Sequence, residues 1–198
     1  MKGLFCFIIK PKNGRYNNTK KVGDVDLILN TEIQNHNFVN RTGIVLATPI
    51  NMPSEIQVGD EVIVHHNVFR RFHNVRGIEV NSTCYFDEDT YIVYIDQIFM
   101  YKRNNQWFSL DDYCFVKPIK NEQEYSMLKE VWLKGIIKYG NKNLEKIGLY
   151  KGSKIGFSPN SDYEFIIDNE KLYRVKNDSV TINYGHKEQE KEYNPSWL

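Results

Sequence analysis

The chain has 198 residues, and its 26 lysine and arginine residues nearly balance 25 aspartate and glutamate residues, for a formal net charge of +1 at pH 7. Without a bulk positive field, a role in binding nucleic acid has no electrostatic support. No window approaches the roughly 18 apolar residues that a spanning helix needs, and the first apolar run is too short for a signal peptide. We therefore expect a soluble, cytosolic protein without a nucleic-acid or membrane partner.

Short β-rich runs bounded by turn residues follow one another through the first half of the chain. They are rich in Ile, Val, Phe and Tyr and end at Pro, Gly, Asn or Asp, which is typical of strands. No stretch before Glu122 repeats its apolar residues with the 3.6-residue period of a helix. The pattern predicts an all-β fold with strands at residues 4–9, 43–47 and 57–64 and in several segments between 75 and 101.

The segment 12–42 interrupts this pattern. It is too long and too polar to be one strand, yet it carries an isolated aliphatic cluster, Leu27, Ile28 and Leu29, preceded by Gly23. A structureless insertion of this length inside a compact domain is usually functional or disordered. We therefore predict a flexible arm that presents a short adhesive segment to a partner. The alternative is that residues 25–29 form an extra edge strand packed on their own domain.

The second half of the chain repeats the landmarks of the first half in the same order. This repetition predicts two small β-barrels in tandem, spanning residues 1–108 and 109–185 and followed by a charged tail at 186–198. The paired landmarks are Cys6-Phe7 with Cys114-Phe115, residues 42–47 (TGIVLA) with 134–139 (KGIIKY), 57–64 (QVGDEVIV) with 150–157 (YKGSKIGF), and 94–100 with 176–182.

The two copies differ in their connections. The second copy lacks most of the arm and has NEQEYSMLKEVWL at residues 121–133 in its place, which we expect to form a short helix or an ordered loop. The first copy also has a longer stretch at residues 68–83. Only the first barrel is therefore expected to carry an adhesive arm.

In both copies the motifs resemble the GroES-type co-chaperonins. That family has an opening strand with a Lys-Pro exit, a mobile loop, G-x-V-L-A, then V-G-D-x-V-I and a closing strand. The first copy reads FCFIIKP, GIVLA, VGDEVIV and IDQIFM; the second reads YCFVKP, GIIKY, KGSKIGF and IIDNEKLYRVKNDSV. The likeness extends to about Tyr184. A short connection in place of the roof hairpin is similar to phage-encoded members, and the duplication is similar to plastid double co-chaperonins.

The resemblance implies a protein that is not an enzyme and that caps a GroEL-type chaperonin to help an enclosed client fold, with a phage capsid protein as the expected client. It implies no cofactor, because ATP is bound by the chaperonin, and a location in the cytoplasm of a bacterial or infected host cell. Subunits of the family form a homo-oligomeric ring, which we expect to be heptameric. The resemblance assigns chaperonin binding to Leu27, Ile28 and Leu29, and the ring interface to Phe5, Phe7 and Ile9 beside Ile98 and Met100.

Other functional classes have less support from the residues. The histidines and the three cysteines, Cys6, Cys84 and Cys114, have no metal-ligand spacing, and no G-x-G-x-x-G motif is present. The main rival is a phage structural or assembly protein that keeps this scaffold and binds no chaperonin, since a fold does not fix a function. Oligonucleotide binding has 13 Tyr and 11 Phe in its favour but lacks a basic groove.

Overall fold

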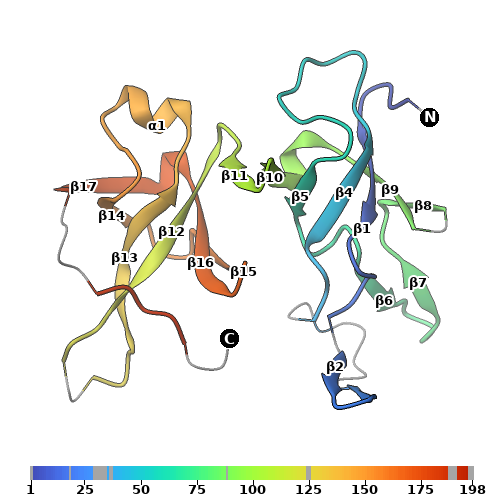
Figure 1. Ribbon diagram of the computed structural model, residues 1–198, viewed down its shortest axis with the longest axis horizontal. Coiled ribbons are helices and arrows are strands. Elements are labelled where there is room, and N and C mark those ends of the chain that lie inside the picture. Colours follow the sequence, from blue (N-terminus) through green and yellow to red (C-terminus); the bar gives the residue numbers. More distant parts are fainter. Residues whose placement is uncertain are drawn as a thin grey trace. The chain divides into compact units, whose positions relative to one another are not determined.

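Figure 1 shows the chain as a computed structural model, which describes residues 2–17, 19–28, 35, 38–87, 89–123, 126–186 and 191–195. The chain divides into two compact units, Met1–Gln106 and Trp107–Leu198, here called the first unit and the second unit. Both are built from antiparallel strands, so the predicted all-β class is confirmed. Among the helices of the described residues, none has the length and apolar character to span a membrane.

The main sheet has seven strands in the order β11-β10-β5-β4-β1-β9-β8; six of them belong to the first unit, and β11 begins at its last residue. β1 lies between β4 and β9, and a single 3₁₀ turn, η1 (Ile95–Gln97), leads into β10. The strands are β1 (Phe7–Pro11), β4 (Thr42–Ala47), β5 (Glu61–Val64), β8 (Tyr85–Asp87), β9 (Thr90–Val93), β10 (Ile98–Arg103) and β11 (Gln106–Ser109).

Two short hairpins stand outside this sheet. β2 (Thr19–Val22) pairs only with β3 (Val25–Ile28), and β6 (Arg71–His73) pairs only with β7 (Glu79–Asn81), each as a two-stranded sheet. The first hairpin lies in the predicted arm, and the second lies in the longer stretch near residues 68–83. Both segments that set the first copy apart in the sequence are therefore hairpins added to the main sheet.

The sheet of the second unit has six strands in the order β15-β16-β12-β13-β14-β17. A five-residue helix, α1 (Lys142–Lys146), follows β13, and a 3₁₀ turn, η2 (Asn177–Ser179), precedes β17. In residues 121–133 the described part contains no helix, so the ordered-loop alternative holds there until β13 begins. The strands are β12 (Tyr113–Lys120), β13 (Glu130–Tyr139), β14 (Ser153–Phe157), β15 (Asp162–Ile167), β16 (Glu170–Lys176) and β17 (Val180–His186).

The two units share one strand order. Read from β10 to β8, the first sheet runs in the same sequence of pairings as the second sheet read from β17 to β15. The register agrees as well, because Pro11 pairs with Gly43 and Pro118 pairs with Gly135. The turn before the next strand is also the same, with Gly59 at φ 90 and Gly152 at φ 89. The repeat seen in the sequence is therefore a repeat of topology.

One sequence landmark is shifted by a residue. Phe7 pairs with Val93, and Cys114 takes the corresponding place opposite Val175. The residue of the second unit that matches Phe7 is therefore Cys114, and the proposed match of Cys6 with Cys114 is wrong. Cys6 lies five positions before Pro11, whereas Cys114 lies four positions before Pro118, so the two cysteines do not occupy equivalent positions.

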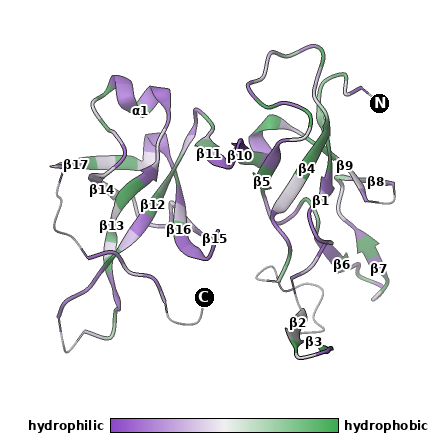
Figure 2. Ribbon diagram, viewed as in Figure 1, coloured by the Kyte–Doolittle hydropathy of each residue, from purple (hydrophilic) through white to green (hydrophobic). Residues whose placement is uncertain are grey.

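Burial alternates along β4, whereas β10 and β12 bury four consecutive residues and so are covered on both faces; Figure 2 shows hydrophobic residues along β4 and β13. In the second unit the core includes Cys114, Val116, Ile137, Ile155 and Val175. Burial raises the pKa of the Cys114 thiol to about 12, which makes it a structural residue. In the described residues neither sheet closes on itself: β11 and β8 end one sheet, and β15 and β17 end the other. The structure thus has two open antiparallel sheets where the sequence suggests two barrels.

Candidate functional site

The β2–β3 hairpin of the first unit contains the predicted adhesive segment. Val22 pairs with Val25 across a two-residue turn of Gly23 and Asp24, and Gly23 has φ 63. A glycine with positive φ at the first turn position, followed by a residue with ordinary φ, is the pattern of a type II′ turn. This turn twists in the same sense as the two strands, so a short Gly-Asp sequence is enough to form the hairpin.

The hairpin exposes its apolar side chains. Leu27 is 53% exposed and Ile28 is 61% exposed, and Val22 and Val25 at the turn are more than half exposed as well. Leu29, the third residue of the predicted segment, lies outside the described residues. The edge-strand alternative is right that a strand forms here, but β3 pairs only with β2 and does not join the main sheet. Exposed apolar clusters of this kind mark interaction sites.

The two ends of the arm are held together where it leaves the sheet. Asn40 is 2% exposed, and its side-chain amide donates hydrogen bonds to the carbonyl oxygens of Lys12 and Gly14, the latter at 2.6 Å. Its Oδ1 accepts a bond of 2.9 Å from the backbone N–H of Thr42. Asn40 therefore links backbone groups on both sides of the arm through one buried side chain.

The second hairpin of the first unit braces the arm. The Arg15 guanidinium donates to the Phe69 carbonyl at 3.1 Å and to Asn81 Oδ1 at 2.8 Å. The Tyr16 hydroxyl accepts a bond of 2.7 Å from the backbone N–H of Arg71. These partners are far from the arm in sequence, so sequence reasoning missed Arg15 and Asn40 as supporting residues. A rigid base with a projecting apolar tip can present the tip to a partner at low entropic cost.

Four of the five expected ring-interface residues lie in the core of the first unit. The side chains of Phe7, Ile9, Ile98 and Met100 are fully buried, whereas Phe5 is exposed. β1 is hydrogen-bonded to β4 on one side and to β9 on the other, and β10 lies between β5 and β11. β1 and β10 are thus paired on both edges within the described residues, and of the five predicted interface residues only Phe5 has an exposed side chain.

In the described part of the chain, no three His, Cys, Asp or Glu residues gather in a way that could hold a metal ion. His65 and His66 stack on each other with ring centroids 4.2 Å apart, and His65 Nδ1 accepts a bond from the backbone N–H of Asn67. His36 lies outside the described residues.

No model of a known protein family matches the chain, and no curated protein matches it either. The candidate site consequently rests on its own geometry, which is an apolar hairpin on a braced base in one of two repeated units.

Proposed function

We propose that the chain is a co-chaperonin subunit of the GroES type, whose β2–β3 hairpin docks into an apolar groove on a GroEL-type chaperonin. The observation that carries this proposal is the exposure of Leu27 and Ile28 on a hairpin whose base is locked by Asn40 and Arg15. The two repeated units are, in this proposal, two GroES-like barrel modules, and only the first docks.

The energetics favour many weak arms over one strong one. Full burial of an aliphatic side chain yields roughly 1.5 to 3 kcal/mol, while ordering a loop costs on the order of 1 to 2 kcal/mol per residue. A single hairpin with a few apolar side chains therefore binds weakly. A homo-oligomeric ring, seven-membered in this proposal, would present several hairpins together, and avidity can then exceed the single-arm affinity by roughly 100 to 10,000-fold.

One arm per chain matches one groove per chaperonin subunit, and the second units then form a further tier above the docking ring. The chaperonin supplies ATP binding, so the chain itself needs no cofactor and no catalytic residue. Its work is to enclose an unfolded client in the cytoplasm. The short connection between β4 and β5 leaves the top of the ring open, which suits a bulky phage capsid protein.

The decisive experiment is capture of a GroEL-type chaperonin by the immobilised full chain, with and without ATP. We expect nucleotide-dependent capture by the unaltered protein and its loss in Ile28→Asp, because a carboxylate cannot be buried in an apolar groove. The matched control is Val75→Asp, at a fully exposed position of the β6–β7 hairpin in the same unit. Capture that survives Ile28→Asp would contradict the assignment of the hairpin.

Native mass measurement tests the assembly separately. A ring of identical chains is the expected result, and a stable monomer at micromolar concentration would contradict the proposal. A ring that captures no chaperonin would instead identify an assembly or structural protein built on the same scaffold.

A further inference from the structure

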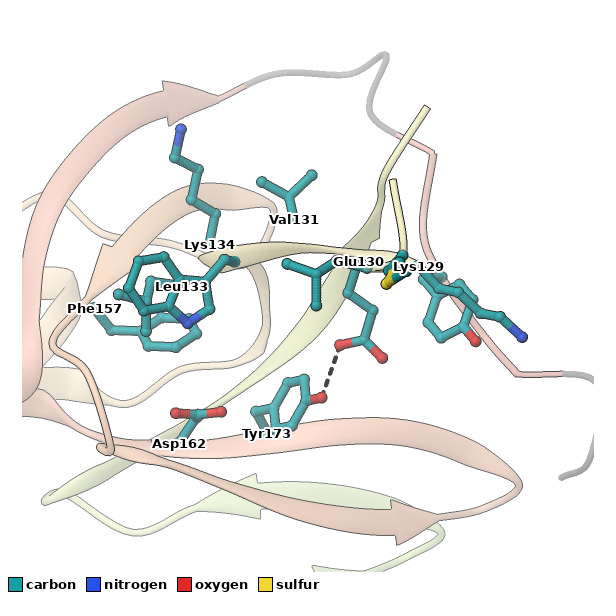
Figure 3. Close-up of a pocket in the computed structure, with 12 residues that line it drawn as sticks. Lys129, Glu130, Val131, Leu133, Lys134, Phe157, Asp162 and Tyr173 are labelled. Carbon is teal, nitrogen blue, oxygen red and sulfur yellow. Dashed lines mark hydrogen bonds between the residues drawn. The ribbon is translucent and has the colours of Figure 1, made fainter. Parts of the chain in front are cut away.

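The second unit contains a pocket of about 390 Å³ at the start of β13, shown in Figure 3. Its walls come from the beginning of β13, from Phe157 at the end of β14, from Asp162 at the start of β15 and from Tyr173 on β16. Tyr193, from the described part of the C-terminal segment, completes the lining. Several aromatic rings and two carboxylates therefore face one hollow.

The first unit shows what fills the corresponding space. Tyr91 pairs with Ile9, and Tyr173 takes the same place opposite Val116. Phe69, from the stretch that precedes β6, packs edge-to-face on Tyr91 with the ring centroids 4.8 Å apart and is fully buried. In the second unit β15 begins only a few residues after β14 ends, so no insertion supplies a matching ring. Tyr173 borders the pocket instead.

The segment that leads into β13 and the first half of that strand form one wall of the pocket, which is lined by residues 127–134 without a gap. Leu133 has φ 53, a conformation that a leucine rarely adopts and that folds retain mainly at functional positions. Trp132 is 70% exposed, and Met127 and Leu128 at the rim are exposed as well. A large apolar surface is thus left open beside the hollow.

The placement of charges in the pocket favours a basic ligand. Lys171 Nζ lies 2.7 Å from a carboxylate oxygen of Glu130 and 3.0 Å from one of Glu164, so this ammonium group forms ion pairs with both residues. In the part of the chain that the structure describes, the Asp162 carboxylate makes no ion pair. Figure 3 shows Glu130 and Asp162 on either side of Tyr173, while Lys134 points away from them and places its Nζ 5.0 Å from the Tyr184 ring. Lys129 and Lys134 also line the pocket and balance the charges of Glu130 and Asp162, so a basic ligand is favoured by the position of the Asp162 carboxylate and not by a net negative charge.

We propose that this pocket binds an extended polypeptide segment of a partner in which an aromatic residue stands next to a basic one. The aromatic ring enters against Tyr173, as Phe69 lies against Tyr91, and the basic side chain reaches Asp162. Trp132 covers the segment from the β13 side and supplies a face for stacking with a guanidinium. The site is separate from the β2–β3 hairpin, so it does not depend on chaperonin docking.

The first unit provides the probe. The acetylated and amidated peptide HNVFRRFH, which copies residues 66–73, contains the ring that packs on Tyr91 and two arginines. It is titrated into the full chain, and binding is followed by isothermal titration calorimetry, a readout that every variant shares. We expect saturable binding that Asp162→Asn and Trp132→Ala each weaken by about tenfold, as loss of one charge pair or stacking contact of about 1.4 kcal/mol predicts. Asp178→Asn and Tyr150→Ala, two changes at exposed positions of the same unit, are the matched controls and should leave it unchanged.

Two further measurements test whether the aromatic residue of the peptide is needed for binding and whether this site is independent of chaperonin docking. The peptide HNVARRAH, which keeps the arginines, is expected to bind at least about tenfold more weakly, because the aromatic anchor is lost. Equal binding by the altered and unaltered chains, or affinity for arginine amide alone equal to that for the peptide, would overturn the proposal. Ile28→Asp must bind the peptide normally, so failure of chaperonin docking and failure of this site remain distinguishable.

Discussion

The two units are built on the same strand order and differ in what is added to it. The additional residues of the first unit form the β2–β3 hairpin and the β6–β7 hairpin that braces it. In this unit the space beside Tyr91 is occupied by the ring of Phe69. The second unit has short connections and leaves the hollow over Tyr173 open. The comparison shows that the two units share the strand order of their sheets, whereas the candidate binding surfaces lie in the connecting segments. Residues inserted into a surface connection cost little free energy of folding.

The turns before β5 and β14 are equivalent in the two units, but a different side chain accepts the backbone hydrogen bond in each. The turn before β5 needs an acceptor for the backbone N–H of Gln57, which Asp60 Oδ2 provides at 2.8 Å. In the second unit Ser153 Oγ accepts from the backbone N–H of Tyr150 at 3.0 Å. Both acceptors are buried. The charged version requires a further partner, and Arg103 supplies it through bonds of 3.0 and 2.6 Å to the two Asp60 oxygens.

The largest expected effect comes from breaking that ion pair. Arg103→Leu leaves the Asp60 carboxylate buried without its counter-charge, so the free energy of unfolding should fall by clearly more than the loss of one neutral hydrogen bond would cause. Removal of the neutral acceptor by Ser153→Ala costs about 1 kcal/mol, because only one hydrogen bond is lost. Urea denaturation measures both values, and Arg76→Leu at an exposed site of the first unit is the control. Equal losses at the two turns would refute the distinction drawn between them.

The next effect tests the base of the arm. Asn40→Ala leaves the carbonyl oxygens of Lys12 and Gly14 without their side-chain donor and is expected to cost about 2 kcal/mol. The residue of the second unit at the same distance before the shared glycine is Trp132, which is largely exposed, so Trp132→Ala should cost under about 0.5 kcal/mol. Hydrogen exchange is the sharper readout. Faster exchange at Asn17 and Thr42 is expected only in Asn40→Ala, and unchanged exchange there would contradict the bracing role.

Removal of the hydroxyl group is expected to change stability in opposite directions at Tyr91 and Tyr173, which occupy equivalent positions in the two units. The buried Tyr91 hydroxyl has no hydrogen-bond partner among the described residues, whereas the Tyr173 hydroxyl donates to Glu130 at 2.7 Å. Tyr91→Phe should therefore leave stability unchanged or raise it by up to about 1 kcal/mol, and Tyr173→Phe should lower it by about 1 kcal/mol. Thermal unfolding of the two single variants decides this, with a marked loss in Tyr91→Phe as the contrary result.

The same hydroxyls make stability sensitive to alkali. Burial raises the pKa of Tyr91 to about 12 from a usual value of 10.0, so the folded state keeps the proton after the unfolded chain has lost it. The corresponding stability is complete below pH 10 and is lost as the pH rises from about 10 through about 12, to an extent on the order of 2 kcal/mol. Tyr91→Phe should flatten this part of the pH profile of unfolding, and an unchanged slope would show that Tyr91 does not cause it.

Much of the fold follows from local residue patterns. The β-rich runs with their turn residues predict the strands near Gly43, Gly59 and Gly135, and the repeated order of landmarks predicts two copies of one topology. The isolated Leu27 and Ile28 in a polar segment identify the exposed hairpin. These signals are local, because a strand or a turn depends on residues next to one another in the chain.

Tertiary structure alone decided the rest. Pairing of β1 on both edges puts Phe7 and Ile9 in the core, although their sequence also suits an exposed edge. Asn40 and Arg15 acquire their roles from partners distant in sequence, and the pocket beside Tyr173 exists because no insertion like that of Phe69 fills it. Which strands become neighbours, whether a sheet closes and where space is left between strands all depend on residues that are far apart in the sequence. The sequence by itself determines which segments extend and turn, and packing determines which of their surfaces remain open to a partner.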